Sequence, residues 1–147
     1  MIEVSVSRVG NSINTKQAVV ILSKKEGNDI FPIGIGLNEA LAIFISLNNK
    51  QVPRPLTHDL LSNILNKYKI KFKKVEITEK DNNKIFYAEA VLEKKTHLTR
   101  MDCRSSDGIA LALREKAPIY VSQEIADEHF VNMPPSEIIE PLEVKRM

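Results

Sequence analysis

The chain has 147 residues, of which 43% are hydrophobic and 27% charged, and its formal net charge is +2. This composition supports one domain, or two small halves that share a core, and it lacks the basic excess of a dedicated DNA-coating protein. The single cysteine, Cys103, excludes an internal disulfide and a cysteine-cluster metal site. No apolar run approaches the ~20 residues of a membrane span, and the amino terminus lacks a signal-peptide pattern. We therefore expect a cytoplasmic protein with no membrane partner.

The first half of the chain predicts three strands followed by two helices. Alternating or continuous apolar residues indicate strands at 2–7, 18–22 and 30–35. Apolar residues then follow helical spacing from Leu37, and Thr57 is a suitable N-cap for a second helix. The apolar face of that helix comprises Leu60, Leu61, Ile64, Leu65 and Tyr68.

The second half begins with the same pattern. Strands are predicted at 71–78, 84–93 and 96–103, with a turn at 81–83, and a helix opens at Ser105 or Ser106. A proline-led connector at 117–121 comes next. Ser122 is then expected to cap a short helix with Ile125, Ala126 and Phe130 inward.

These patterns indicate an internally duplicated α+β fold. Residues 38–43 correspond to 106–111 at a constant shift, which pairs Glu39 with Asp107, and Pro55 corresponds to Pro118. We predict two three-strand, two-helix units, at about 1–69 and 70–131, that share one mixed or antiparallel sheet with helices packed on it. Residues 132–147 are expected to form an extended tail. The alternative is that any two strand–helix units look alike at this level.

The segment 53–60, with sequence PRPLTHDL, carries candidate functional residues on a rigid connector. Its two prolines fix the backbone and remove donors, and the charged side chains beside them suit chemistry or anion binding. His58 can act as a general acid or base, and Asp59 can orient a partner histidine or bind a metal. The alternative is that both are exposed first-turn residues beside a threonine cap.

A second candidate group spans the junction of a strand and a helix. Arg100, Asp102 and Arg104 alternate onto one strand face, where Asp102 would hold both guanidinium groups in place. Spare donors of such arginines suit a phosphate. The alternative is an ion-paired row on a solvated face of the sheet.

The helix start that follows offers two hydroxyls, from Ser105 and Ser106, together with free backbone N–H groups. Asp107 in the same turn argues against a bare phosphate there unless a cation bridges the two. Glu39 is the counterpart of Asp107 in the first half. The alternative is that a serine only caps the helix and that Asp107 complements the helix dipole.

Five blocks together carry a family resemblance: IG with EA at 35–40, PRPLTHDL at 53–60, FYA at 86–88, DCRSSDGIALALR at 102–114, and APIYV at 117–121. The chain resembles the bifunctional nuclease (BFN) domain family over nearly its whole length. Cys103 and Ser105 stand where that family often has small residues and proline. The resemblance implies a compact α+β domain, often dimeric, and plant members of the family are described as degrading RNA and DNA.

Our first hypothesis is therefore a nuclease that hydrolyses phosphodiester bonds in RNA or DNA. It assigns catalysis to His58, Asp59, Asp102 and Asp107. It assigns substrate binding to Arg54, Arg104, Ser105 and Ser106. A divalent cation such as Mg²⁺ would be held by Glu39, Asp102 and Asp107.

Two other hypotheses keep the same residues without cleavage. One is a regulatory module that binds a nucleotide, a nucleic acid or a protein. The other is that the arginine and aspartate blocks only lock the two halves and an interface of a homodimer or higher homo-oligomer.

Overall fold

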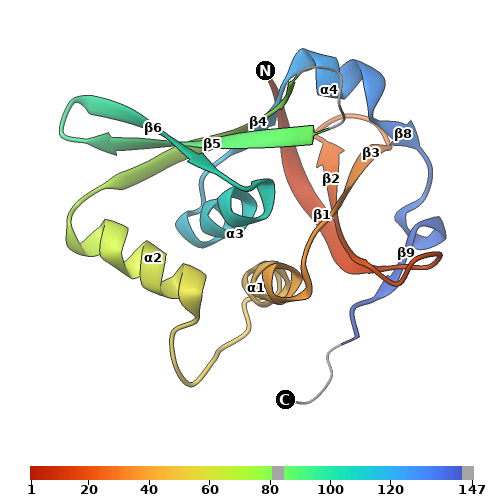
Figure 1. Cartoon of the computed structure of the whole chain (residues 1–147), viewed down its shortest axis with the longest axis horizontal. Coiled ribbons are helices and arrows are strands. Elements are labelled where there is room, and N and C mark those ends of the chain that lie inside the picture. Colours follow the sequence, from red (N-terminus) through yellow and green to blue (C-terminus); the bar gives the residue numbers. More distant parts are fainter. Residues whose placement is uncertain (81–84, 144–147) are drawn as a thin grey trace.

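The computed structural model describes residues 1–80 and 85–143, so the turn predicted at 81–83 lies outside the described residues. Within the described ranges, nine strands form one sheet and four α-helices pack on it (Figure 1). The helices are α1 (Leu37–Leu47), α2 (Thr57–Lys67), α3 (Ser105–Glu115) and α4 (Gln123–Glu128), with a 3-10 turn at Pro135–Glu137. The strands are β1 (Ile2–Ser12), β2 (Ala18–Lys24), β3 (Asp29–Gly34), β4 (Lys71–Lys80), β5 (Ile85–Lys94), β6 (His97–Cys103), β7 (Ile119–Val121), β8 (Val131–Asn132) and β9 (Ile139–Pro141).

The strand order confirms the predicted α+β class with a mixed sheet. It runs β6-β5-β4-β7-β1-β2-β3-β8, and β9 pairs with β1 outside this path. Every pairing is antiparallel except that of β4 with β7. The two antiparallel meanders, β1-β2-β3 and β4-β5-β6, therefore lie on either side of β7. Their internal duplication stays a prediction.

The interpretation of 117–121 as a mere connector was wrong. Its residues Ile119–Val121 form β7, which hydrogen-bonds to β4 on one side and β1 on the other and so joins the two meanders. Ile119 and Val121 are 4% and 0% exposed. Alternating β-branched residues suit a short strand that is buried on one face, and that pattern outweighs the preceding proline.

Helices α1, α2 and α3 lie on the concave side of the curved sheet, where α1 and α2 both meet α3. Helix α3 packs on β4 and β5, while α1 packs on β1 and β2, and both α1 and α2 contact α3 (Figure 1). Helix α4 lies at the opposite end of this view from α2 and packs on β4. Three segments that are distant in sequence, the starts of α1, α2 and α3, are thereby brought together.

The helix starts differ in how they are capped. Ser122 caps α4 as predicted, because its Oγ accepts the backbone N–H of Ile125 at 3.3 Å. Helix α2 does not use Thr57: its N-cap residue is Leu56, whose backbone N–H donates to Asp59 Oδ2 at 2.9 Å. Helix α3 does open at Ser105, yet its N-cap is Arg104 and no side chain caps it. The serine-cap alternative for α3 is therefore wrong.

The apolar face of α2 is largely uncovered in this chain. Leu60 and Tyr68 are 54% and 63% exposed, and Leu61 and Ile64 are also exposed. The α2 residues that are buried are His58 and Ser62. The helix therefore presents its apolar stripe to solvent and to the cleft described below.

Close packing of α3 on β4 depends on Gly108. A Cβ atom built there would lie 2.5 Å from Val75 Cγ2, closer than two carbon atoms pack. We expect Gly108→Ala to lower the free energy of unfolding by about 1–2 kcal/mol, because overpacking costs about 1–3 kcal/mol and the gain in helix propensity returns up to about 1. Urea unfolding measures this loss. When Val75 is also replaced by alanine, Gly108→Ala should lower the free energy of unfolding by less, because the clashing methyl group of Val75 is gone. If the losses of the two single variants simply add in the double variant, the proposed contact is contradicted.

Within the described ranges, no helix has both the length and the apolar character needed to cross a membrane.

Part of the carboxy-terminal segment, which the sequence predicts to be an extended tail, joins the sheet. Strand β9 pairs with β1 at Gly10 to Ser12, and Ile139 is 6% exposed.

Candidate functional site

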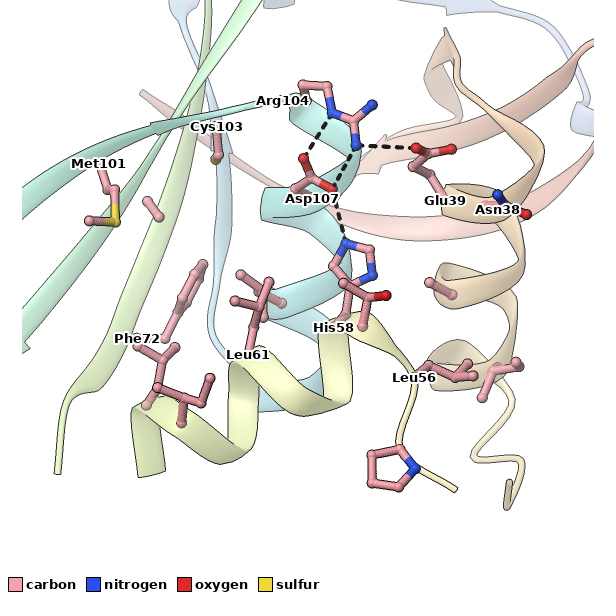
Figure 2. A pocket seen from close by; sticks show the side chains of 18 of the residues that line it. Asn38, Glu39, Leu56, His58, Leu61, Phe72, Met101, Cys103, Arg104 and Asp107 are labelled. Atoms are coloured by element: carbon pink, nitrogen blue, oxygen red, sulfur yellow. Dashed lines mark hydrogen bonds and ion pairs between the residues drawn. The ribbon is translucent and has the colours of Figure 1, made fainter. Parts of the chain in front are cut away.

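A cleft of about 1120 Å³ opens between α1, α2 and the β4-β5-β6 meander (Figure 2). Most of its wall is apolar. The apolar residues that line it include Leu41, Ile45, Leu61, Ile64, Phe72, Leu92, Met101 and Leu111. Its polar lining residues are Asn38, Glu39, Thr57, His58, Asp102, Arg104 and Asp107. The site is thus a large apolar groove with a charged cluster beside it.

A chain of four ionisable side chains forms that cluster. His58 Nε2 lies 2.9 Å from Asp107 Oδ1. Arg104 donates to the same carboxylate, from Nε to Oδ2 at 2.9 Å and from Nη2 to Oδ1 at 3.3 Å. Arg104 Nη2 also lies 3.1 Å from Glu39 Oε1. Figure 2 shows these groups converging from α1, α2 and the start of α3.

Each member of the cluster owes its place to a helix start. Glu39 and Asp107 lie in the first turns of α1 and α3, and His58 lies in the first turn of α2. Arg104 is the N-cap residue of α3, so its side chain folds back over Asp107. Because the three helices meet at α3, these separate turns supply one acid–imidazole–guanidinium cluster.

Asp107 is the electrostatic centre of the cluster. Partial burial would raise the pKa of its carboxyl, but hydrogen bonds from Arg104 and His58 outweigh burial and lower that pKa below its ordinary value. Asp107 is therefore ionised at neutral pH. The side chain of His58 is 11% exposed, whereas that of Arg104 is 69% exposed. The guanidinium faces solvent while the imidazole is held beneath it.

Asp59 does not join this cluster and does not line the cleft. Its Oδ1 accepts a hydrogen bond from Arg114 Nε at 2.6 Å. Burial opposes ionisation of Asp59, but the Leu56 N–H and the Arg114 guanidinium outweigh it and lower the pKa of the carboxyl. Arg114 also donates to the carbonyl oxygens of Ala110 and Ala42. This pair, in which Arg114 is buried and Asp59 half-buried, therefore ties the start of α2 to α3 and α1.

The other residues singled out from the sequence are scattered. Asp102 is exposed on β6 and lines the cleft. Arg54 is exposed but lies outside the cleft, in the connector before α2. Ser105 and Ser106 are 8% and 6% exposed and do not line the cleft. Ser105 Oγ is buried with no hydrogen-bond partner among the described residues.

The predicted pairing of Asp102 with two arginines was wrong. Arg100 pairs with Glu76 of β4, on the same face of the sheet, and Arg104 pairs with Asp107 and Glu39. The reason is that Arg104 lies just beyond the end of β6, as the N-cap residue of α3, so its side chain does not follow the strand alternation.

Cys103 also lines the cleft and is half-buried. Burial and the nearby carboxylates of Asp107 and Asp102 raise the pKa of its thiol to about 11. At neutral pH the thiol is protonated, so Cys103 is a poor nucleophile and acts as part of the apolar wall.

Sequence reasoning missed Arg114 as the partner of Asp59. A signal for it was present, because Arg114 lies two helical turns after Asp107 and therefore on the same face of α3. That face meets the first turn of α2, where His58 pairs with Asp107 and Asp59 pairs with Arg114.

The fold and the cluster define an α+β domain with an acid–imidazole–guanidinium site beside an apolar cleft. The family model described as the bifunctional nuclease domain matches residues 20–134. The chain belongs to this family, which confirms the resemblance seen in the sequence motifs.

Individual relatives show how far the similarity extends. An uncharacterized protein of Mycobacterium tuberculosis is 34% identical over 109 residues, which cover 74% of this chain and 64% of the relative. Bifunctional nuclease 1 of Oryza sativa subsp. indica is 26% identical over 111 residues, covering 73% of this chain and 33% of the plant protein. Bifunctional nuclease 2 of Arabidopsis thaliana is 25% identical over 113 residues, covering 74% and 34%. The matched part thus spans about two thirds of the mycobacterial relative and a third of the plant proteins.

Proposed function

We propose that this domain is a nuclease that hydrolyses phosphodiester bonds in RNA or DNA at the charged end of the cleft. The observation that carries the proposal is the 2.9 Å contact of His58 with Asp107, in a carboxylate cluster that also holds Arg104. Membership of the bifunctional nuclease domain family supports it. The plant relatives named as nucleases support the reaction class.

His58 is the proposed general acid or base. Asp107 accepts from its Nε2, which fixes the orientation of the ring and stabilises the imidazolium form. The second ring nitrogen, Nδ1, has no side-chain partner among the described residues and can exchange a proton with water or the leaving oxygen. Asp107 acts through His58 and Arg104 and is a positioning residue.

Arg104 is the proposed phosphate-binding residue. Its Nε and Nη2 are held by Asp107 and Glu39, while Nη1 has no partner among the described residues. A guanidinium that two carboxylates orient can present its remaining donors to phosphoryl oxygens at little entropic cost. Arg54 is exposed on the connector before α2, where it can contact a longer substrate outside the cleft.

The charge balance of the cleft supports the proposed divalent cation. Among the described residues that line the cleft, Glu39, Asp102 and Asp107 bring three carboxylates and Arg104 is the one permanent cation. A bound phosphodiester would add a further negative charge. Oxygen donors suit Mg²⁺, which typically uses one or two carboxylates together with water and substrate oxygens. The cation would neutralise charge at phosphorus and lower the pKa of a bound water. His58 and Arg104 would then supply the proton and the second phosphate contact.

Cleavage of short labelled RNA and DNA oligonucleotides by the purified protein tests this function. We expect cleavage in the presence of Mg²⁺ and its loss in EDTA, because the cluster alone is too negative to hold a phosphodiester. Restored cleavage after Mg²⁺ is added back controls for damage by the chelator. Oligonucleotide binding without any cleavage, with and without Mg²⁺, would contradict the proposal.

The apolar lining of the cleft favours one alternative, a non-catalytic module that binds a protein. Ile64 and Leu61, both exposed, form part of this wall, and they are less suited to a polyanion than to apolar side chains. This module would bind its partner equally well with His58 intact or replaced. The oligonucleotide assay separates the two functions, because the module would show no turnover.

A homodimer is the oligomeric state that we propose. Met101 of β6, which is 54% exposed, lines the cleft together with Leu61 and Ile64 of the exposed α2 stripe. A self-complementary interface between two copies would remove this apolar surface from water. We expect Leu60→Glu to produce a monomer, as measured by light scattering after size-exclusion chromatography. Asn63→Glu, also exposed on α2, is the matched control, and a wild-type monomer would contradict the proposal.

A further inference from the structure

A second group of metal-binding side chains lies at the far end of the sheet. Glu79 of β4, Glu128 at the end of α4, and His129 each offer one ligand atom, and these atoms lie within 4.8 Å of one another. His129 Nε2 is 2.8 Å from Glu79 Oε2. The imidazole also packs against the rings of Phe31 and Phe86, with centroid distances of 5.8 Å and 5.1 Å. The ring is therefore held in a fixed orientation.

Glu79 is more deeply buried than its hydrogen bonding explains. Its side chain is 6% exposed, and His129 is its one side-chain partner among the described residues. A carboxylate can accept about four hydrogen bonds, and burying its charge is costly unless a cation or several donors compensate. Glu128 adds a second carboxylate without an ion-pair partner in the described ranges. Among the described residues, the cluster thus has two acids and one imidazole with no ion pair to a lysine or arginine.

We propose that Glu79, Glu128 and His129 form a binding site for a divalent transition-metal ion, best matched by Zn²⁺. Zinc bonds to histidine nitrogen at about 2.0–2.1 Å and to carboxylate oxygen at about 2.0–2.2 Å. Donor atoms already gathered within 4.8 Å reach such an ion by small rotations, and Glu128 is exposed and free to make them. The imidazole favours Zn²⁺ over Mg²⁺, which prefers oxygen donors alone and keeps its waters. A water completes the coordination.

The site is separate from the cleft. Phe72, which lines the cleft, and Glu79 lie on the same strand, seven residues and thus about 23 Å apart in an extended chain. Figure 1 likewise places α4 at the end of the molecule opposite α2. A metal here links α4 to β4 and stabilises their packing without contacting the substrate. The inference therefore stands whether or not the cleft cleaves nucleic acid.

Calorimetric titration of the EDTA-treated, dialysed full chain with Zn²⁺ tests the site. We expect binding of one ion that Glu128→Gln and His129→Asn each weaken by more than about tenfold. Glu124→Gln, an exposed acid on the same helix, is the matched control and should bind as the wild type does. His58→Asn should also retain binding, because His58 belongs to the cleft.

A thermal-unfolding readout accompanies the titration. Zn²⁺ at about a hundredfold excess over its Kd should raise Tm by roughly 5 °C, and Mg²⁺ should not. At the same Zn²⁺ concentration Glu128→Gln should reduce this rise to about half or less, and it should leave the metal-free Tm unchanged because the side chain is exposed. The proposal is overturned if Zn²⁺ fails to bind, if binding survives in both Glu128→Gln and His129→Asn, or if His58→Asn alone abolishes it.

Discussion

Replacing His58 with asparagine is expected to slow phosphodiester cleavage by about 10²–10⁴-fold, the range typical of losing a general acid or base. Asparagine is similar in size and can still donate a hydrogen bond to Asp107, so the packing of α2 on α3 should survive. Its amide cannot exchange a proton near neutral pH. Single-turnover cleavage of a labelled oligonucleotide, at saturating Mg²⁺, measures the effect.

His97→Asn is the matched control for this experiment. His97 is an exposed histidine on β6 and is not among the residues that line the cleft. Its replacement should leave the cleavage rate unchanged. A loss in His58→Asn but not in His97→Asn, purified in the same way, excludes a contaminating nuclease as the source of cleavage. Equal rates for the wild type, His58→Asn and His97→Asn would remove His58 from the chemistry.

Asp59→Asn is expected to lower the free energy of unfolding by about 3 kcal/mol, because it leaves the buried guanidinium of Arg114 without its counter-ion. The side chain of Arg114 is 7% exposed. In the variant, Arg114 would keep its hydrogen bonds to the carbonyl oxygens of Ala110 and Ala42. We therefore expect a loss near the lower end of the range for breaking a buried ion pair, about 3–5 kcal/mol. Chemical denaturation at neutral pH measures the loss.

The stability difference between the wild type and Asp59→Asn should become smaller as the pH falls. The pKa of Asp59 is lower in the folded protein than its ordinary value of 3.8, so the folded state favours the ionised carboxylate. The stabilisation is fully present above the unfolded-state pKa and is lost as the pH falls through the folded-state pKa. The stability gap between the wild type and Asp59→Asn should therefore be constant near neutral pH and shrink below about pH 3.8.

Asp127→Asn serves as the control for the Asp59 variant. Asp127 is an exposed acid on α4 that accepts a hydrogen bond from Gln123, and its loss should change stability by less than about 0.5 kcal/mol. A gap between the wild type and Asp59→Asn that stays constant down to strongly acid pH would show that the Asp59–Arg114 pair is not the source of the stability.

The strands and helices of this fold could be predicted from local patterns because each element carries its own period. The strand at 18–22 and the helix beginning at Leu37 match β2 and α1 closely. Strand β7 was not recognised, because its three residues are too few for a period and its pairing with β4 and β1 is decided by tertiary contacts. The apolar face of α2 was visible in the sequence, but not its exposure.

The cluster was predictable as a set of residues but not as a set of pairs. Glu39, His58, Arg104 and Asp107 were each singled out from the sequence, and the meeting of α1, α2 and α3 brings them together. Which acid binds which base depends on the angles at which the helices cross. Thus His58 meets Asp107 while its neighbour Asp59 meets Arg114. Adjacent residues of a helix point about 100° apart, so they reach different partners.

The central claim is that His58 and Asp107 act as one unit in a single solvent-open cleft. A double-mutant cycle on the cleavage rate, using His58→Asn, Asp107→Asn and the combined variant, tests it most directly. The account predicts that each single variant is strongly impaired and that the combined variant is slowed by clearly less than the product of the two single effects, because Asp107 acts partly through His58. Independent effects that multiply in the combined variant, or single variants as fast as the wild type, would contradict it.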